Sequence, residues 1–353
     1  MKKLFWPSVA MVLLLSACGE ETSGEADEIE ETSSEETGGE AEVSLTFSHF
    51  FPSNHIKETD VVDYFITELQ DRTDGQVEFE SYPGGQLAEP DGQYEAAATN
   101  VADAGFSVHS YTPSQFPLTS VMELPFVGTS GEEASQTLWD LYDEFPEIQE
   151  EYEDTYPLWL STSEPGQIFT VDQPVESPED LEGLQIRSPS PEVNAWLEEM
   201  GATPVSMSMD ETYEALERGV VDGTVGPPHT LLDYSLQEVI DYVTVGDFYM
   251  TTFFAVMNQG SYEMLDEEAQ QALDELAGAE MSQHSGQIID EREQEAMEAV
   301  EEAGAEVHEV SDDEAGDWEE GLQPVIDDWI ERMEEDGLPG QEVYDRAVEL
   351  GAD

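Results

Sequence analysis

Arg187 is the residue whose type and position most directly indicate binding chemistry. The chain has 9 Lys and Arg against 84 Asp and Glu, and Lys2 and Lys3 belong to its first residues. Of the other basic residues, only Arg187 falls at the end of a predicted strand beside a turn, because the rest fall in or near predicted helices. A guanidinium group presents a planar fork of donors that fits a carboxylate. The alternative is a structural ion pair under a loop.

The remaining polar residues give little sign of catalysis. His49, His55, His109 and His229 fall near predicted strand ends or the loops that follow, but no two have the spacing of metal ligands. We therefore expect hydrogen-bonding or loop-packing roles, with no metal and no cofactor. The sequence has no G-x-S-x-G, no H-E-x-x-H and no phosphate-binding glycine loop. It predicts a binding protein and not an enzyme.

The elements around Arg187 alternate between strand and helix. Short apolar runs at 184–187, 202–205 and 220–225 predict strands, and helical spacing predicts helices over 191–200 and after Asp210. Strands that alternate with helices favour a parallel sheet, whose ligands bind outside the carboxyl ends of the strands. Arg187 falls at such an end.

The first half of the chain repeats this alternation, with strands predicted at 43–47, 77–82 and 104–108 and helices at 57–72 and 93–101. Strands at 156–161 and 167–171 are expected to carry the chain from one domain to the other. The apolar run at 250–258 is expected to carry it back. A helix is expected over 267–304, and an amphipathic one over 318–335. The fold class is therefore α/β with two domains. We assign 43–164 plus 251–290 to the first, and 165–250 plus 291–353 to the second.

Residues 1–18 have the pattern of a signal peptide. Lys2 and Lys3 precede an apolar core at 9–15 that is too short to span a membrane, and residues 15–18 resemble a bacterial lipobox. This predicts lipidation of Cys18, the single cysteine of the chain, so neither an internal disulfide nor thiol catalysis is expected. Residues 19–42 are acidic, with one large apolar residue, and predict a disordered tether.

The net charge of −75, with a pI near 4.1, disfavours nucleic acid and anionic membranes as partners. The carboxylates are spread along the chain, so their repulsion would strain a compact fold in dilute buffer. High salt shortens the range of that repulsion to a few ångströms. We interpret the composition as that of an extracytoplasmic protein of a halophile.

Several motifs occur in an order that is similar to one known family. They lie at 82–87 (YPGGQL), 124–126 (LPF), 178–187 (PEDLEGLQIR), 201–204 (GATP), 211–216 (ETYEAL), 219–223 (GVVDG) and 256–258 (VMN). The set, which covers about residues 43 to 335, resembles the solute-binding proteins of TRAP transporters, the DctP-type family. The resemblance implies a periplasmic-binding-protein-like fold with a central ligand cleft and a long helix that spans both domains. It also implies a receptor that delivers a small organic anion to a membrane permease.

The resemblance further implies a set of site residues. The family's carboxylate-binding arginine corresponds to Arg187. A second position, often basic in the family, is occupied here by Gln167. A position that is frequently asparagine in the family is occupied here by Gly226. These two departures predict a singly charged, rather apolar pocket, and hence a monocarboxylate ligand. The remaining expected cleft residues are His49, Phe50, His109, Tyr111, Met209 and His229.

Four other interpretations remain open at this point. A zwitterionic compatible solute such as ectoine also offers a carboxylate to Arg187. A receptor for an ABC importer would lack the long helix that spans both domains. An enzyme on a related two-domain fold would need an acid–base pair or a metal site. A structural surface lipoprotein would lack a cleft that encloses a ligand.

Overall fold

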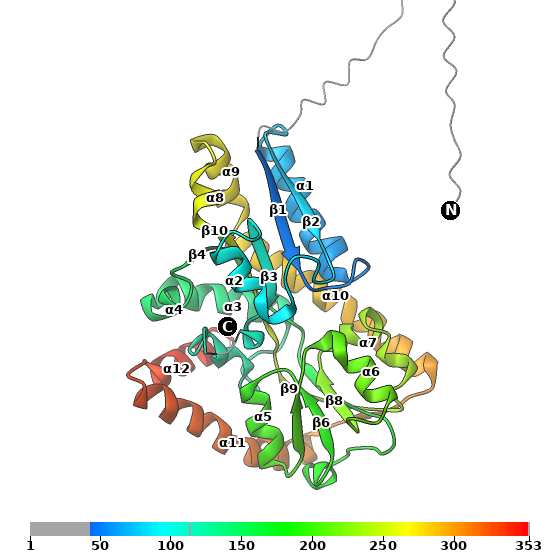
Figure 1. The fold of residues 1–353 in the computed structure, drawn as a ribbon. Coiled ribbons are helices and arrows are strands. Elements are labelled where there is room, and N and C mark those ends of the chain that lie inside the picture. The colour runs from blue at the N-terminus through cyan, green and yellow to red at the C-terminus, as the bar shows by residue number, and fades with distance from the viewer. Residues whose placement is uncertain (1–42, 113, 352–353) are drawn as a thin grey trace, which may run out of the picture. The chain divides into compact units, whose positions relative to one another are not determined.

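Two β-sheets organise the part of the chain that the structure describes (Figure 1). The computed structural model describes residues 43–112 and 114–351, all within one compact unit, Glu40–Asp353. The predicted leader, Cys18 and the tether lie outside the described residues. None of the described helices is both long enough and apolar enough to cross a membrane.

The first sheet has the order β2-β1-β3-β10-β4. Its strands are β1 (Val43–His49), β2 (Val77–Tyr82), β3 (Ala104–Val108), β4 (Thr155–Thr162) and β10 (Thr252–Asn258). β1 pairs in parallel with β2 and β3, and β10 lies antiparallel between β3 and β4. We call the part of the protein around this sheet the first lobe.

The second sheet has the order β11-β9-β5-β8-β6-β7 and defines the second lobe. Its strands are β5 (Gly166–Thr170), β6 (Gln185–Ser188), β7 (Thr203–Ser206), β8 (Gly223–Gly226), β9 (Tyr242–Tyr249) and β11 (Glu306–Glu309). β6 is parallel to β7 and β8, as predicted, but β5 is antiparallel to β8 and β9, so the sheet is mixed. The chain crosses between the sheets after β4 and returns after β9, also as predicted.

Helices cover both sheets. They are α1 (Asp63–Arg72), α2 (Gln93–Ala98), α3 (Gly131–Glu144), α4 (Pro146–Glu150), α5 (Pro191–Glu199), α6 (Thr212–Glu217), α7 (His229–Asp233), α8 (Gln259–Glu263), α9 (Glu267–Leu276), α10 (Ala279–Ala303), α11 (Asp312–Glu335) and α12 (Gly340–Leu350). A π-helical segment, η1 (Lys57–Val62), runs into α1. Short 3-10 turns at His109–Tyr111 and Met209–Glu211 follow β3 and precede α6.

The prediction of one helix over 267–304 is wrong, because the chain breaks between α9 and α10. Gly278 at the break has φ 71° and ψ −131°, a backbone conformation that favours glycine. A Cβ atom there would lie 2.8 Å from the ring of Trp139. The single helix α10 contacts α3 and β4 in the first lobe and also α7 in the second lobe. The expected helix that spans both lobes is therefore present, but it is shorter than predicted.

The C-terminal helices also connect the lobes. Trp318 of α11 packs with Trp196 in the core of the second lobe. Val343 of α12 packs instead with Leu138 and Phe254 in the first lobe. The domain boundaries given above remain a prediction, and this packing places α12 beside the first sheet rather than the second.

Candidate ligand-binding site

A cavity lies between the two lobes, beside the carboxyl end of β6. Its wall consists of Phe50, Phe51, His55, Val108, Tyr111, Thr251 and Phe253 from one side, and Arg187, Pro189, Met209, Pro227, His229, Thr230 and Tyr234 from the other. The cavity is small, about 20 Å³, and lies far below the usual volume of small-molecule sites. The side chains of the two walls therefore nearly meet, and a ligand of several atoms needs them to move apart.

Arg187 lies in this wall with only 1% of its surface exposed. Its Nε donates a hydrogen bond to the carbonyl oxygen of Met207 at 3.0 Å, and Nη1 donates to that of Val225 at 3.3 Å. Nη2 donates to the hydroxyl of Tyr111 at 2.9 Å. The parallel pairing of β6 with β7 and β8 brings Met207 and Val225, which follow or end those strands, within reach of the guanidinium group.

The charge of Arg187 has no protein counter-ion within salt-bridge distance in the described ranges. A guanidinium carries five N–H bonds, and the three described hydrogen bonds leave one on Nη1 and one on Nη2. A buried charge is costly unless an opposite charge pairs with it. Two adjacent free donors on a buried cation suit the two oxygens of one carboxylate.

Tyr111 links the two lobes at the same point. Its hydroxyl accepts hydrogen bonds from Nη2 of Arg187 and from the backbone N–H of Met209, each at 2.9 Å. Burial raises the pKa of Tyr111, so the hydroxyl keeps its proton at neutral pH. Because the oxygen already accepts twice, its own proton is free to be donated to a ligand.

The rest of the wall near Arg187 is apolar and aromatic. Phe50 packs against Tyr111 with ring centroids 5.6 Å apart, and against Phe51 at 4.3 Å. Phe253 and Met209 extend this surface. Of the predicted cleft residues, the structure thus brings Arg187, Phe50, Tyr111, Met209 and His229 into one wall.

Gln167 and Gly226 do not line the cavity. The amide oxygen of Gln167 accepts from the backbone N–H groups of Gly246 and Asp247, and its amide nitrogen donates to Asp247 Oδ1 at 2.7 Å. Gln167 therefore holds a bend in β9. Gly226 pairs with Gln167 in the sheet, and a Cβ atom there would lie 3.1 Å from Cε of Met209. Its small size leaves room for Met209.

His49 and His109 are also outside the wall. Nε2 of His49 lies 2.7 Å from a carboxylate oxygen of Glu58, inside the first lobe. Nε2 of His109 lies 2.7 Å from the hydroxyl of Tyr152, and burial lowers the pKa of His109 to about 3. His109 is therefore neutral and structural in this arrangement.

Lys57 and Glu164 form a charged group behind the cavity that sequence analysis missed. Lys57 was expected near a helix start, yet it is fully buried, with its ammonium 3.7 Å from the ring centroid of Phe253. Burial lowers the pKa of Lys57 to about 7, against the opposing effect of Glu164 and Asp233. The helical spacing of the sequence could not reveal this burial, because the rings beside the ammonium group, Phe106 and Phe253, are distant in the chain.

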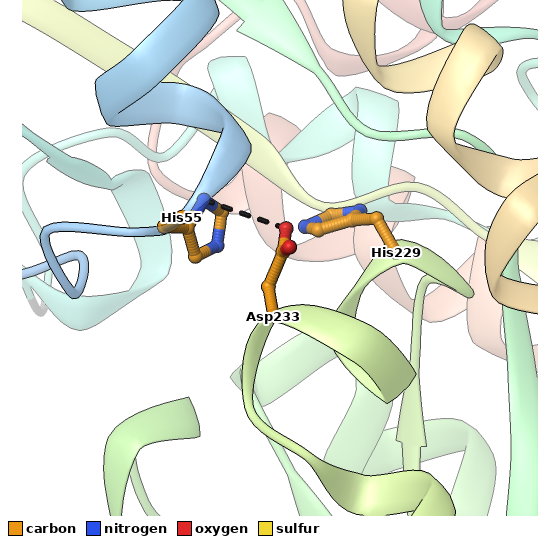
Figure 2. A group of neighbouring side chains, drawn as sticks. All are labelled: His55, His229 and Asp233. Atoms are coloured by element: carbon orange, nitrogen blue, oxygen red, sulfur yellow. Dashed lines mark ion pairs between the residues drawn. The ribbon is translucent and has the colours of Figure 1, made fainter.

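His55, His229 and Asp233 converge beside this group, as Figure 2 shows. One ligand atom of each lies within 4.8 Å of the others, so by residue type the three could hold a metal ion. Asp233 is already paired with Arg292, however, at 3.0 Å. Nδ1 of His55 accepts the backbone N–H of Lys57 at 3.0 Å. These contacts occupy ligand atoms of Asp233 and His55, and the nearby Lys57 and Arg292 carry positive charge. Both features disfavour a metal ion at this position.

The dashed contact in Figure 2 joins Nδ1 of His55 to Oδ2 of Asp233 at 3.6 Å. Burial lowers the pKa of His55 well below its usual range, and the neighbouring His229 and Lys57 lower it further. His55 is therefore neutral, and because its Nδ1 accepts a hydrogen bond, the contact is not an ion pair. Oδ2 of Asp233 is buried without a hydrogen-bond partner among the described residues.

The comparisons with known proteins identify the family of the chain. The family model for bacterial extracellular solute-binding protein, family 7 (DctP), matches residues 47–332. The chain belongs to this family. The resemblance seen in the sequence motifs is thereby confirmed, and this DctP-family protein is an extracytoplasmic solute receptor that works with the membrane permease subunits of a TRAP transporter.

Solved structures confirm the predicted fold. A TRAP solute-binding protein from a marine metagenome, specific for aromatic acid ligands and co-crystallised with 3-hydroxybenzoate, is 29% identical with a TM-score of 0.85; the match covers 88% of this chain and 98% of that one. A TRAP solute-binding protein from Rhodoferax ferrireducens, with copurified benzoate, is 26% identical with a TM-score of 0.85, covering 88% and 97%. This DctP-family protein thus has the mixed α/β, two-domain fold of periplasmic binding proteins.

One curated relative bears on the ectoine alternative. The ectoine-binding periplasmic protein TeaA of Halomonas elongata is 27% identical over 301 residues, which cover 82% of this chain and 86% of the relative. Membership of the DctP family and the helix α10 exclude the ABC-importer interpretation.

Proposed function

We propose that this receptor binds a small organic monocarboxylate with an apolar, aromatic body in the cavity between its lobes. The observation that carries the proposal is Arg187, a buried cation with two free N–H donors and no acidic side chain within salt-bridge distance in the described ranges. The ligand carboxylate supplies the missing charge. The benzoate and 3-hydroxybenzoate complexes of the two similar structures support a ligand of this size and type.

Binding is coupled to the approach of the lobes. In the proposed mechanism the ligand enters while the walls are apart, and its carboxylate meets Arg187 of the second lobe. Phe50, Phe51 and Tyr111 of the first lobe then close over its apolar part. Contacts made only in the closed form give the ligand its higher affinity for that form, which is what drives closure. The permease receives the ligand from the closed receptor.

A zwitterion is a poorer fit to the same cavity. Its cationic group needs an anion or acceptors in the wall, but the lining contains no Asp or Glu. Glu164 and Asp233 lie behind the lining, where His229 and Arg292 already pair with them. A dicarboxylate would leave its second charge without a second arginine.

We further propose that Cys18 is lipidated and holds the receptor at the outer face of the cell membrane through an acidic tether, and that the source is a halophile. These proposals depend on the lipobox pattern and on the net charge of −75.

Calorimetric titration in buffer of molar salt tests the ligand class. The panel is benzoate, a short aliphatic monocarboxylate, succinate and ectoine. We expect measurable binding of a monocarboxylate, and tighter binding of the aromatic member because it fills the apolar wall. Tighter binding of succinate or ectoine than of every monocarboxylate would contradict the proposal.

A further inference from the structure

A second cavity between the lobes shares no lining residue with the ligand cavity. It encloses about 420 Å³, and its charged or titratable lining residues are His109, Glu123, Glu192, Arg332 and Asp336. Glu123 ends a 3-10 segment of the first lobe, η4 (Thr119–Glu123), and η4 contacts α5 of the second lobe. The approach of the lobes therefore brings acidic side chains of both lobes to one cavity.

Glu123 is buried with one of its oxygens unsatisfied. Only 1% of its surface is exposed. Its Oε1 accepts a hydrogen bond from Oγ1 of Thr252 at 2.7 Å, whereas Oε2 is buried without a hydrogen-bond partner among the described residues. Removing a carboxylate oxygen from water without giving it a donor disfavours the ionised form. A proton bound to Glu123 would relieve that cost.

Glu192, in the first turn of α5, adds a second buried carboxylate from the other lobe. Its Oε1 accepts a hydrogen bond from Nη2 of Arg332 at 2.9 Å. The end of α11 that holds Arg332 packs in the core of the first lobe through Trp329 and Met333, so this ion pair joins the two lobes. One guanidinium group thus serves two buried carboxylates, and one negative charge is left unbalanced.

The other titratable groups around the two glutamates do not supply the missing positive charge. His109 is neutral, because burial lowers its pKa to about 3. Tyr249, which also feels the charge of Glu123, keeps its proton because burial raises its pKa. Asp336, exposed at the edge of the cavity, adds negative charge. The described residues of α3, α12 and β10, which also pack against η4, contribute no titratable group to this wall.

We propose that closure of the lobes takes up one proton, which Glu123 and Glu192 share, so that the receptor binds its ligand more tightly at acidic than at alkaline pH. With the lobes apart, water reaches the two carboxylates and both are ionised at neutral pH. With the lobes together, the proton balances the remaining negative charge. The inference rests on the proposed function, in which ligand binding closes the lobes.

The link between closure and protonation fixes the sign of the effect. Burial, and next the charge of Glu192, raise the pKa of Glu123 from 4.5 to about 8. Burial also raises the pKa of Glu192, against the opposing effect of Arg332. A carboxyl group with a higher pKa in the closed form takes up a proton on closure at any pH between its two pKa values. The affinity should therefore be highest below this window and fall as pH rises through it, by at most about tenfold per pH unit.

The first test measures the proton directly on the unaltered protein. Calorimetric titrations in molar salt at pH 6.5 use benzoate, or whichever monocarboxylate of the panel binds most tightly, in phosphate and in imidazole buffer. These buffers differ in enthalpy of ionisation, so the difference between the two binding enthalpies counts the protons taken up. We expect about one proton, and a dissociation constant that rises by about ten- to a hundredfold from pH 5.5 to pH 7.5. Ligand binding without proton uptake would overturn the inference and leave the proposed function standing.

The second test changes the carboxyl pair. Glu123→Gln has the shape of the protonated acid but does not titrate, so proton uptake should fall by about one, and at pH 7.5 the variant should bind about tenfold more tightly than the wild type. Glu192→Gln leaves one carboxylate to one guanidinium and should also lower the uptake. Glu198→Gln, at an exposed position of the same helix α5, is the matched control and should behave as the wild type.

The comparison of variants separates this proton from any that His55 or His229 exchanges beside the ligand. An uptake that is unchanged in both Glu123→Gln and Glu192→Gln would overturn the inference.

If no carboxylate of the panel binds, the proposed ligand class fails, and small-angle X-ray scattering of the protein without ligand tests the inference separately. In molar salt the wild type should have a smaller radius of gyration at pH 5.5 than at pH 8.5, because protonation favours the closed form. Glu123→Gln should lose this difference. An equal radius of gyration of the wild type at both pH values would then overturn the inference.

Discussion

Replacing Arg187 tests the proposed site most directly. In the proposal this one side chain supplies the charge for the ligand, and in the structure it makes three hydrogen bonds within the protein. Arg187→Gln removes the cation, and Arg187→Lys keeps a charge but not the fork. Loss of one partner of a buried charge pair weakens binding by about 2–5 kcal/mol. Since about 1.4 kcal/mol is a factor of ten, the dissociation constant should rise by about 30-fold or more.

The effect on the unliganded protein should be smaller. Each lost hydrogen bond to Met207, Val225 or Tyr111 costs about 0.5–1.5 kcal/mol of the free energy of unfolding. Removing an uncompensated buried cation offsets part of that loss, because the cost of burying it is several kcal/mol. We therefore expect the melting temperature without ligand to fall by a few degrees at most.

The assay combines calorimetry with thermal melts, both in molar salt. A ligand at 100 times its dissociation constant stabilises the native state by about 2.7 kcal/mol, so the wild type should show a clear rise in melting temperature. That rise should be absent in both variants. Tyr111→Phe is the matched control, since it removes one hydroxyl but leaves the guanidinium group, and should cost less affinity than either Arg187 variant. Near-native affinity in Arg187→Gln would refute the site, and unfolding of the variant without ligand would favour a structural role.

Four further predictions test other parts of the molecule. Cys18→Ser should leave the protein unprocessed or release it from membranes in cell fractionation, and normal processing with membrane retention would contradict lipidation. The melting temperature should rise as salt goes from dilute to molar, because few cations pair with the 84 Asp and Glu, and a flat profile would count against adaptation to high salt. Lys57→Met should raise the free energy of unfolding in urea titrations at pH 6, by up to roughly 3–5 kcal/mol, since burial lowers the pKa of Lys57 from 10.5 to about 7. Between pH 7 and pH 10 the unfolded lysine keeps its proton while the native one loses it, so the gain should shrink as pH rises over this range. An equal gain at both ends would show that the native lysine keeps its proton and that burial does not lower its pKa. Dialysis against a chelator, or addition of Zn²⁺, should leave the melting temperature unchanged if His55, His229 and Asp233 hold no metal, and a shift of several degrees would assign them one.

The sequence by itself determined the class of fold and singled out Arg187 as the candidate binding residue. Short apolar runs separated by helical spacing are local signals, so they predicted the strands β1, β2, β3, β6, β7 and β8 and the parallel pairing around β6. The scarcity of basic residues made Arg187 conspicuous. Local spacing failed where a single residue changes the chain direction, as at Gly278, or where a strand has an irregular pattern, as in β9 and β11.

Only the tertiary structure decided which side chains share the cavity. His55 and His229 are 174 positions apart and come together because η1 and α7 meet across the two lobes. Gln167 and His109 were predicted to line the cleft from their positions in the sequence. In the structure Gln167 instead hydrogen-bonds to the backbone of β9, and His109 hydrogen-bonds to the hydroxyl of Tyr152. The burial of Lys57 likewise depends on neighbours that are distant in the chain, such as Phe253. Hydrogen bonds and desolvation act over a few ångströms of space, so no pattern along the sequence can assign them.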